Sequence, residues 1–157
     1  MSATVSVDRD IAAPADAVWA LIADLPRMGE WSPENTGGRW LAPADGPAVG
    51  ARFKGTNARG KRRWSTQVVV TDCHPGRSFG FDVKAGGLRV GHWGYDLEAT
   101  DDGCRVTETF HDTRGRTITF LGTLVSGVSD RATHNRAGME ATLANLATAA
   151  EDAGRRS

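Results

Sequence analysis

The C-terminal stretch SGVSDRATHNRAGMEATLANLATAAED, residues 126–152, is the one part of the chain with sustained helical periodicity. Mostly apolar residues recur at steps of three or four and form one stripe, namely Leu124, Val128, Ala132, Asn135, Met139, Leu143, Leu146 and Ala150. Charged residues and several threonines occupy the opposite side. This pattern predicts an amphipathic helix about 40 Å long.

A helix of this length needs an apolar surface to cover its stripe, because isolated helices are marginal in water. The preceding hundred residues have strand patterns, so the surface that we expect is a curved antiparallel sheet wrapped round the helix. A curved sheet and a straight helix meet closely at one end and separate at the other. We therefore expect an internal cavity between them.

The segment before the helix reads as strand, two short helices, and then more strands. Residues Thr4 to Ile11 alternate as in a half-buried strand, a helix follows Pro14 and ends at Pro26, and Arg27 to Trp31 form a short second helical turn. Turns rich in glycine separate the six further predicted strands, which are Gly38–Leu41, Ala51–Asn57, Arg63–Cys73, Ser78–Lys84, Leu88–Ala99 and Cys104–Thr113. The prediction is an α+β fold with about seven strands.

Composition limits the classes of protein that the chain can belong to. Its 157 residues suit one domain, which we assign to residues 1–153, with residues 154–157 as a disordered tail. Nineteen Lys and Arg balance nineteen Asp and Glu, which argues against a nucleic-acid partner. The sequence has neither an apolar run long enough for stable membrane insertion nor an apolar signal core at its start. We expect a cytoplasmic monomer or homodimer.

Metal and cofactor chemistry is not indicated by the sequence. Cys73 and Cys104 are an isolated pair without zinc-site spacing, and the four histidines form no pair at metal-ligand spacing. We predict no cofactor and no metal site.

The run IAAPADAVWALIADLPRMGEWSP, residues 11–33, resembles the opening signature of the START-like (SRPBCC) superfamily, especially its polyketide cyclase/dehydrase and lipid-transport branch. In that signature a strand ends at Ile-x-Ala-Pro, a helix carries Val-Trp-x-Leu-Ile-x-Asp, and Trp-x-Pro follows. Later pieces are also similar, among them Trp93-x-Tyr95-x-Leu97 and Arg105-Val106-Thr107-Glu108. The resemblance implies the helix-grip fold. It leaves function open, because the superfamily includes carriers, cyclases, aromatases, hormone receptors and co-chaperones on one scaffold.

In such a fold the functional side chains are those that face the cavity. Alternate residues of a strand share one face, and parity selects the set with the most aromatic and apolar members. This inward set is Phe79, Phe81, Val83, Trp93, Tyr95, Leu97, Val106, Glu108 and Phe110, and less firmly Trp64, Thr66, Val68 and Val70. The complete set that we predict to bind a ligand is Trp31, Phe53, Trp64, Thr66, Phe81, Trp93, Tyr95, Glu108, Phe110, Asn135 and Met139.

Glu108 and Tyr95 are the candidate catalytic residues. A carboxyl group between Val106 and Phe110 on an inward face would be desolvated, which raises its pKa and suits it to proton transfer. The alternative is that Glu108 pairs with a basic neighbour at the sheet surface. Tyr95 would bind a ligand through its hydroxyl group, or would fill the core with that hydroxyl on a backbone carbonyl.

Two further features have open interpretations. Asn135 interrupts the apolar stripe of the last helix, and either binds a ligand or ties the helix to a buried strand group. Arg59, Lys61, Arg62 and Arg63 form a basic turn that is either solvated or attracts an anionic head group or phosphate.

Three functions are compatible with these features. The protein is a carrier or sequestering protein for a hydrophobic small molecule, such as a lipid or polyketide-like ring system; an enzyme of the polyketide cyclase, aromatase or dehydrase type; or a co-chaperone-like interaction module. Family members that resemble aromatase/cyclases tend to carry Trp, Ser and Arg in alternation on a pocket strand. Here Trp64 is followed by Thr66 and Val68, so we favour binding.

The proline and glycine content of Pro26 to Gly50 predicts that this segment forms the entrance to the cavity. Its amides should exchange with deuterium faster than those of the predicted strands. Hydrogen exchange followed by mass spectrometry measures this, and protection equal to that of the sheet would contradict the prediction.

Overall fold

The computed structural model describes residues 4–112 and 131–156, with side chains assigned for 4–112 and 135–154. The described elements, in chain order, are β1 (Thr4–Ile11), α1 (Ala15–Ile22), the 3₁₀ helix η1 (Leu25–Glu30), β2 (Asn35–Trp40), β3 (Arg52–Arg59), β4 (Arg62–His74), β5 (Ser78–Ala85), β6 (Leu88–Thr100), β7 (Gly103–Asp112) and α3 (Arg131–Arg156).

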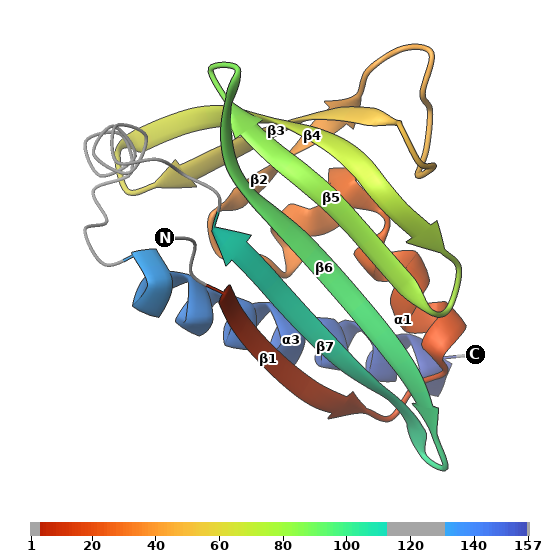
Figure 1. Ribbon diagram of the computed structural model, residues 1–157. Helices are drawn as coiled ribbons and strands as arrows, with labels where there is room; N and C mark the ends of the chain where they lie inside the picture. The colour runs from red at the N-terminus through yellow and green to blue at the C-terminus, as the bar shows by residue number, and fades with distance from the viewer. Residues whose placement is uncertain (1–3, 113–130, 157) are drawn as a thin grey trace.

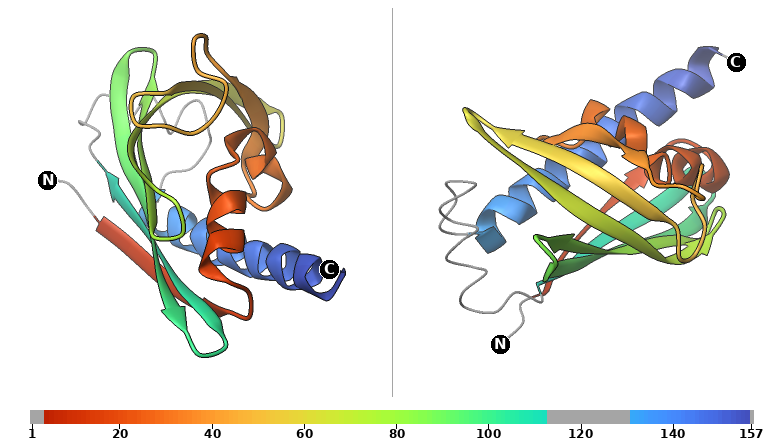
Figure 2. Two further views of the ribbon diagram at one scale, coloured as in Figure 1. Left: turned by 90° about the vertical axis from the view of Figure 1, so that its right-hand side faces the viewer. Right: turned by 90° about the horizontal axis from the view of Figure 1, so that it is seen from above.

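One antiparallel sheet contains all seven of these strands, in the order β1-β7-β6-β5-β4-β3-β2. It is curved, and α1 and α3 lie on its concave side (Figures 1 and 2). The predicted α+β helix-grip fold is therefore confirmed. Between β5 and β6, Gly86 and Gly87 have φ angles of 59° and 80°, as a tight two-residue hairpin turn requires.

The long helix α3 packs mainly against β1 and α1. The apolar members of the predicted stripe whose side chains are described are buried, with Met139, Leu143 and Leu146 each at most 1% exposed. Near the C-terminal end of α3, the Glu151 carboxylate accepts a hydrogen bond from the backbone N–H of Ala12 at 3.0 Å. Within the described ranges, neither α3 nor any other helix has the length and apolar character needed to span a bilayer.

The ends of α3 differ from the sequence prediction. Its predicted first residues, Ser126 to Asp130, lie outside the described residues. The helix continues past the predicted end at Asp152 as far as Arg156, so residues 154–156 are helical where we predicted a disordered tail. Arg is a good helix former, and its positive charge is favourable near a helix C-terminus.

Trp19 fixes α1 to the sheet. Its indole N–H donates a hydrogen bond to the Ser78 carbonyl at 2.7 Å, and its ring packs edge-on against Phe79 with the ring centroids 6.2 Å apart. The helix ends at Ile22, earlier than predicted, and the chain re-forms as η1 with Pro26 at its start. Proline has no N–H to donate and is tolerated only in the first turn of a helix, which separates α1 from η1.

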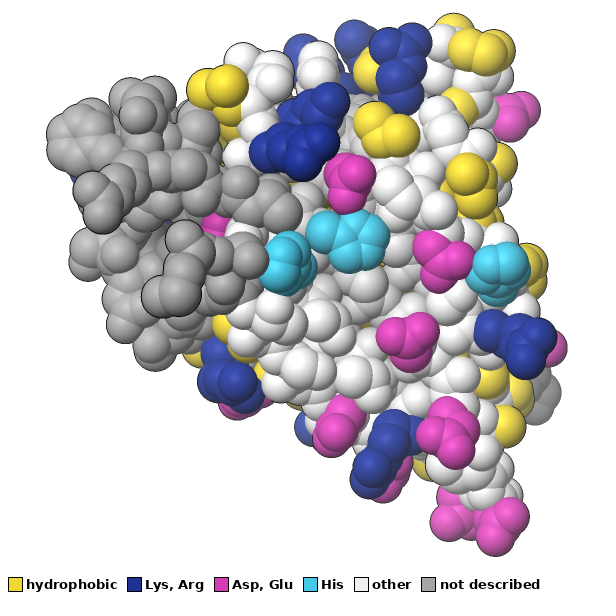
Figure 3. Space-filling view, in the orientation of Figure 1, with side chains coloured by type: hydrophobic (Ala, Val, Ile, Leu, Met, Phe, Trp, Pro, Cys, Tyr) yellow, Lys and Arg dark blue, Asp and Glu magenta, His cyan; other side chains and the backbone are white. Residues whose placement is uncertain are grey.

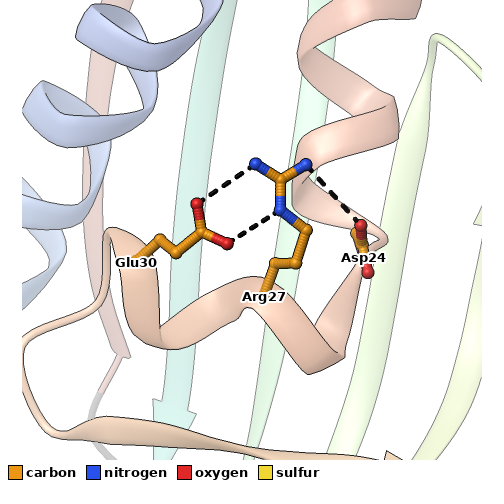
Figure 4. Close-up of polar contacts among 3 residues, drawn as sticks. All are labelled: Asp24, Arg27 and Glu30. Carbon is orange, nitrogen blue, oxygen red and sulfur yellow. Dashed lines mark hydrogen bonds and ion pairs between the residues drawn. The ribbon is translucent and has the colours of Figure 1, made fainter.

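The helix η1 is held in place by charged side chains and by α3. The Arg27 guanidinium donates to both oxygens of Glu30, at 2.8 and 3.1 Å, and lies 3.9 Å from an Asp24 carboxylate oxygen (Figure 4). These groups are exposed, so screening by water keeps the contribution of each pair to stability small. The Asn145 side chain of α3 donates to the Trp31 carbonyl at 2.9 Å, which joins η1 to α3.

Candidate functional site

A cavity of about 400 Å³ lies between the sheet, α3, and the chain from η1 to the start of β2. Small-molecule sites typically measure about 300–1,000 Å³. Ten of the eleven residues that we predicted as ligand-binding line it, namely Phe53, Trp64, Thr66, Phe81, Trp93, Tyr95, Glu108, Phe110, Asn135 and Met139. They come from β3 to β7 and α3, so the fold brings together residues more than 80 positions apart in the chain.

Trp31 is the exception. It is 3% exposed but is not among the residues that line the cavity. The Arg27 guanidinium lies 5.5 Å from its ring centroid, and its carbonyl group binds Asn145. Its place at the junction of η1 and α3 gives it a structural role there.

Sequence reasoning did not place several other residues in the cavity wall. They are Leu25, Met28, Ser32, Pro33, Glu34 and Asn35 from the η1–β2 region, Gly55, Asn57 and Val90 from the strands, and Ala137, Gly138 and Thr142 from α3. Val68 and Val83, which we predicted to face inward, also line the cavity. Gly55 and Asn57 share the parity of Phe53 and could have been included, whereas Val90 has the opposite parity to Trp93 and Tyr95 and reaches the wall at a register shift between β5 and β6. Most of the η1–β2 residues fall in the segment that we predicted as the entrance, but no periodic pattern selects the individual side chains, and only the tertiary structure reveals them.

Strand register aligns the inward residues in rows. Tyr95 on β6 lies directly opposite Glu108 on β7, and Trp93 lies opposite Phe110. The rings of Trp93 and Phe110 are in contact, with centroids 4.4 Å apart. On β6 and β7, the cavity wall therefore places a buried polar pair, Tyr95 and Glu108, beside an aromatic pair.

The Tyr95 hydroxyl group donates a hydrogen bond to Oε1 of Glu108 at 2.9 Å. Glu108 is 2% exposed, and its Oε2 is buried without a hydrogen-bond partner in the described part of the chain. Burial raises the pKa of Glu108 from its ordinary value of 4.5 to about 8, although the hydrogen bond from Tyr95 acts in the opposite direction. At neutral pH the carboxyl group is therefore mostly protonated and can donate as well as accept a hydrogen bond.

These contacts decide between the alternative partners that we considered for Glu108 and Tyr95. Glu108 has a buried partner on the neighbouring strand, and pairing with a base at the sheet surface is ruled out. The Tyr95 hydroxyl group bonds to a carboxyl group and not to a backbone carbonyl. Burial, reinforced by Glu108, raises the pKa of Tyr95 well above its ordinary value, so it stays a neutral donor.

Two further polar side chains of the cavity, Asn135 and Thr142, lie on α3. The Thr142 hydroxyl group is satisfied within the helix, because it donates to the Gly138 carbonyl at 2.8 Å. Asn135 lines the cavity and is half-buried, and the described residues provide no hydrogen-bond partner for its side chain. Neither alternative for Asn135 is decided by this.

A family model described as polyketide cyclase / dehydrase and lipid transport matches residues 2–151. The chain belongs to this family. The resemblance of residues 11–33 to the START-like (SRPBCC) superfamily is thereby confirmed. Membership supports binding of a ligand in general terms, and the identity of the ligand is a separate question.

Solved structures of related fold include a Polyketide_cyc-like protein from Corynebacterium glutamicum, 31% identical, with 96% of this chain and 86% of that chain covered and a TM-score of 0.54. The di-domain ARO/CYC StfQ from the steffimycin biosynthetic pathway is 13% identical, with a TM-score of 0.75 over 98% of this chain and 52% of that chain. An AHSA1-like protein from Aeromonas hydrophila is 21% identical, with a TM-score of 0.65 over 97% and 94%. The latter two likenesses concern the fold alone.

No curated protein matches the sequence. Within residues 4–112 and 131–156, no group of three or more His, Cys, Asp and Glu side chains is arranged to hold a metal ion.

The raised pKa of Glu108 predicts a pH dependence of stability. The folded protein holds the Glu108 proton up to about pH 8, whereas the unfolded chain releases it near pH 4.5, so the free energy of unfolding falls as pH rises between these values. The Glu108→Gln variant cannot titrate. As pH rises from about 5 to about 9, the free energy of unfolding of this variant should increase relative to that of wild type by on the order of a few kcal/mol.

Urea unfolding at the two pH values measures this difference. The matched control is Glu98→Gln, since Glu98 is an exposed glutamate on the same strand as Tyr95. An equal pH dependence in wild type and Glu108→Gln would show that Glu108 titrates normally.

Proposed function

We propose that the protein binds an apolar small molecule of lipid or polyketide-like character that carries a carbonyl or other acceptor oxygen. The observation that carries this proposal is the Tyr95–Glu108 pair, buried in the wall of a cavity of about 400 Å³, with one carboxyl oxygen that has no hydrogen-bond partner among the described residues. A buried polar group without a partner costs about 1–3 kcal/mol, which a ligand oxygen would recover.

The apolar part of the ligand is recognised by rings and aliphatic groups. Trp93, Phe110 and Phe81 offer flat surfaces, and stacking on such surfaces suits planar rings. In the carrier function the neutral Glu108 fixes the orientation of the ligand, and the cavity shields the ligand from water.

Paired aromatic probes test this proposal. Anthraquinone, which has carbonyl oxygens, should bind about tenfold more tightly than anthracene at neutral pH, measured by quenching of tryptophan fluorescence. The preference should disappear in Glu108→Leu and persist in the control Glu98→Gln. If both probes bind equally to wild type, Glu108 does not donate to the ligand.

The enzyme alternative of the cyclase/dehydrase type is favoured by the same pair, because two polar groups meet in the cavity within hydrogen-bond distance. Above its pKa, Glu108 would act as a base on a C–H group next to a ligand carbonyl, and Tyr95 would orient its carboxylate. Below its pKa it would act as an acid.

Proton exchange distinguishes the enzyme from the carrier. In deuterated water, the enzyme should accelerate loss of the α-proton signal of α-tetralone in NMR spectra, with a rate that rises as pH passes through about 8. Glu108→Gln should abolish this acceleration. Binding of the ketone without accelerated exchange would leave the carrier function alone.

A further inference from the structure

The neutral chain hides a strong segregation of charge. Residues 35–95, which span β2 to the middle of β6, contain ten Lys and Arg but three Asp and Glu. This part of the sheet therefore has an excess of seven positive charges, and the remainder of the chain has an equal negative excess. The net charge of zero does not reveal the electric field that this separation of charge produces.

Four of these cations form a row across five strands. Strand register places Arg39 opposite Lys54, Lys54 opposite Gln67, Gln67 opposite Lys84, and Lys84 opposite Arg89. The residues next in the chain to Lys54, Gln67, Lys84 and Arg89 line the cavity, namely Phe53, Val68, Val83 and Val90. Since successive strand residues point to opposite faces, the row lies on the outer side of the cavity wall.

The row is unfavourable for the isolated protein. Like charges directly opposite each other on neighbouring strands destabilise a sheet, and the row contains two such pairs. Among the described residues, no carboxylate forms an ion pair with Arg39, Lys54, Lys84 or Arg89. Figure 3 shows this face, with Lys and Arg gathered over its upper part and Asp and Glu mostly below. An anionic partner would relieve the repulsion.

An exposed apolar residue adjoins the row. Leu88 is 49% exposed at the tip of the β5–β6 hairpin, next to Arg89. It lies opposite Ala85, which has the same strand parity as the cavity-lining Val83. Leu88 therefore continues the apolar cavity wall out to the surface, next to Arg89 at the end of the row.

We propose that the β5–β6 hairpin and the cationic row, defined as Arg39, Lys54, Lys84 and Arg89, dock on the surface of an anionic phospholipid bilayer. Leu88 enters the boundary between head groups and acyl chains, and the row contacts the lipid phosphates. This is peripheral binding and needs no membrane-spanning segment. A nucleic acid would use the positive charges equally well but gives no reason for an apolar tip.

Membrane docking extends the proposed function, and it rests on that function only for the apolar molecule that the cavity would carry. A cavity whose apolar wall continues to a membrane-bound hairpin can exchange an apolar molecule with the bilayer without exposing it fully to water. The docking itself needs no ligand and can be measured on its own.

Co-sedimentation with lipid vesicles tests the docking. The wild-type protein should bind vesicles of phosphatidylcholine mixed with phosphatidylglycerol, and should not bind pure phosphatidylcholine. Binding should be lost in about 1 M salt, where the screening length is about 3 Å. Lys84→Gln/Arg89→Gln should lower partitioning about 25-fold, and Leu88→Ser about fivefold.

The matched control is Arg9→Gln/Arg77→Gln, which removes two exposed positive charges outside the row and should bind as wild type does. Equal binding to neutral and anionic vesicles, or an unchanged Lys84→Gln/Arg89→Gln variant, would overturn the proposal. The proposal would also be overturned if a single-stranded oligonucleotide bound more tightly than the vesicles and Leu88→Ser changed neither the oligonucleotide binding nor the vesicle binding. The anthraquinone measurement is made without vesicles, so failure of the cavity function would be seen separately.

Discussion

The structure depends on the burial of the apolar stripe of α3 against β1 and α1. Met139, Leu143 and Leu146 leave water almost completely, and each such side chain contributes about 1.5–3 kcal/mol relative to an exposed position. Because α3 packs at the β1 side, the strands further along the curved sheet are not covered by it in the same way. The cavity occupies that part of the concave face.

The chemistry of the cavity follows from this arrangement. Phe81, Trp93, Tyr95 and Phe110 on β5, β6 and β7 line the cavity, so a carboxyl group buried among them loses its hydration. Burial raises the pKa of Glu108 and keeps the carboxyl group neutral, while the hydrogen bond from Tyr95 fixes its orientation. A carrier and a proton-transfer enzyme both use such a group, which explains how one scaffold serves both classes. The two functions differ only in whether the proton of Glu108 is transferred.

The two faces of the same strands carry different functions in our proposals. Inward residues such as Val83 and Val90 form the cavity wall, whereas their neighbours Lys84 and Arg89 form a cationic surface. Strand geometry makes this possible, since adjacent residues point in opposite directions and can be selected independently. The β5–β6 hairpin is where the two faces meet at the molecular surface.

The sequence pattern was enough to predict the fold class, the approximate positions of the strands and ten of the residues that line the cavity. Periodicity is a local property, so the parity of β5, β6 and β7 was sufficient to assign Phe81, Tyr95 and Glu108 to the inward face. Only the tertiary structure decided the strand register, which places Tyr95 opposite Glu108 and assembles cations from four strands into one row. It also decided that Trp31 belongs to the η1–α3 junction, because side-chain surroundings in irregular segments depend on distant elements that no local pattern encodes.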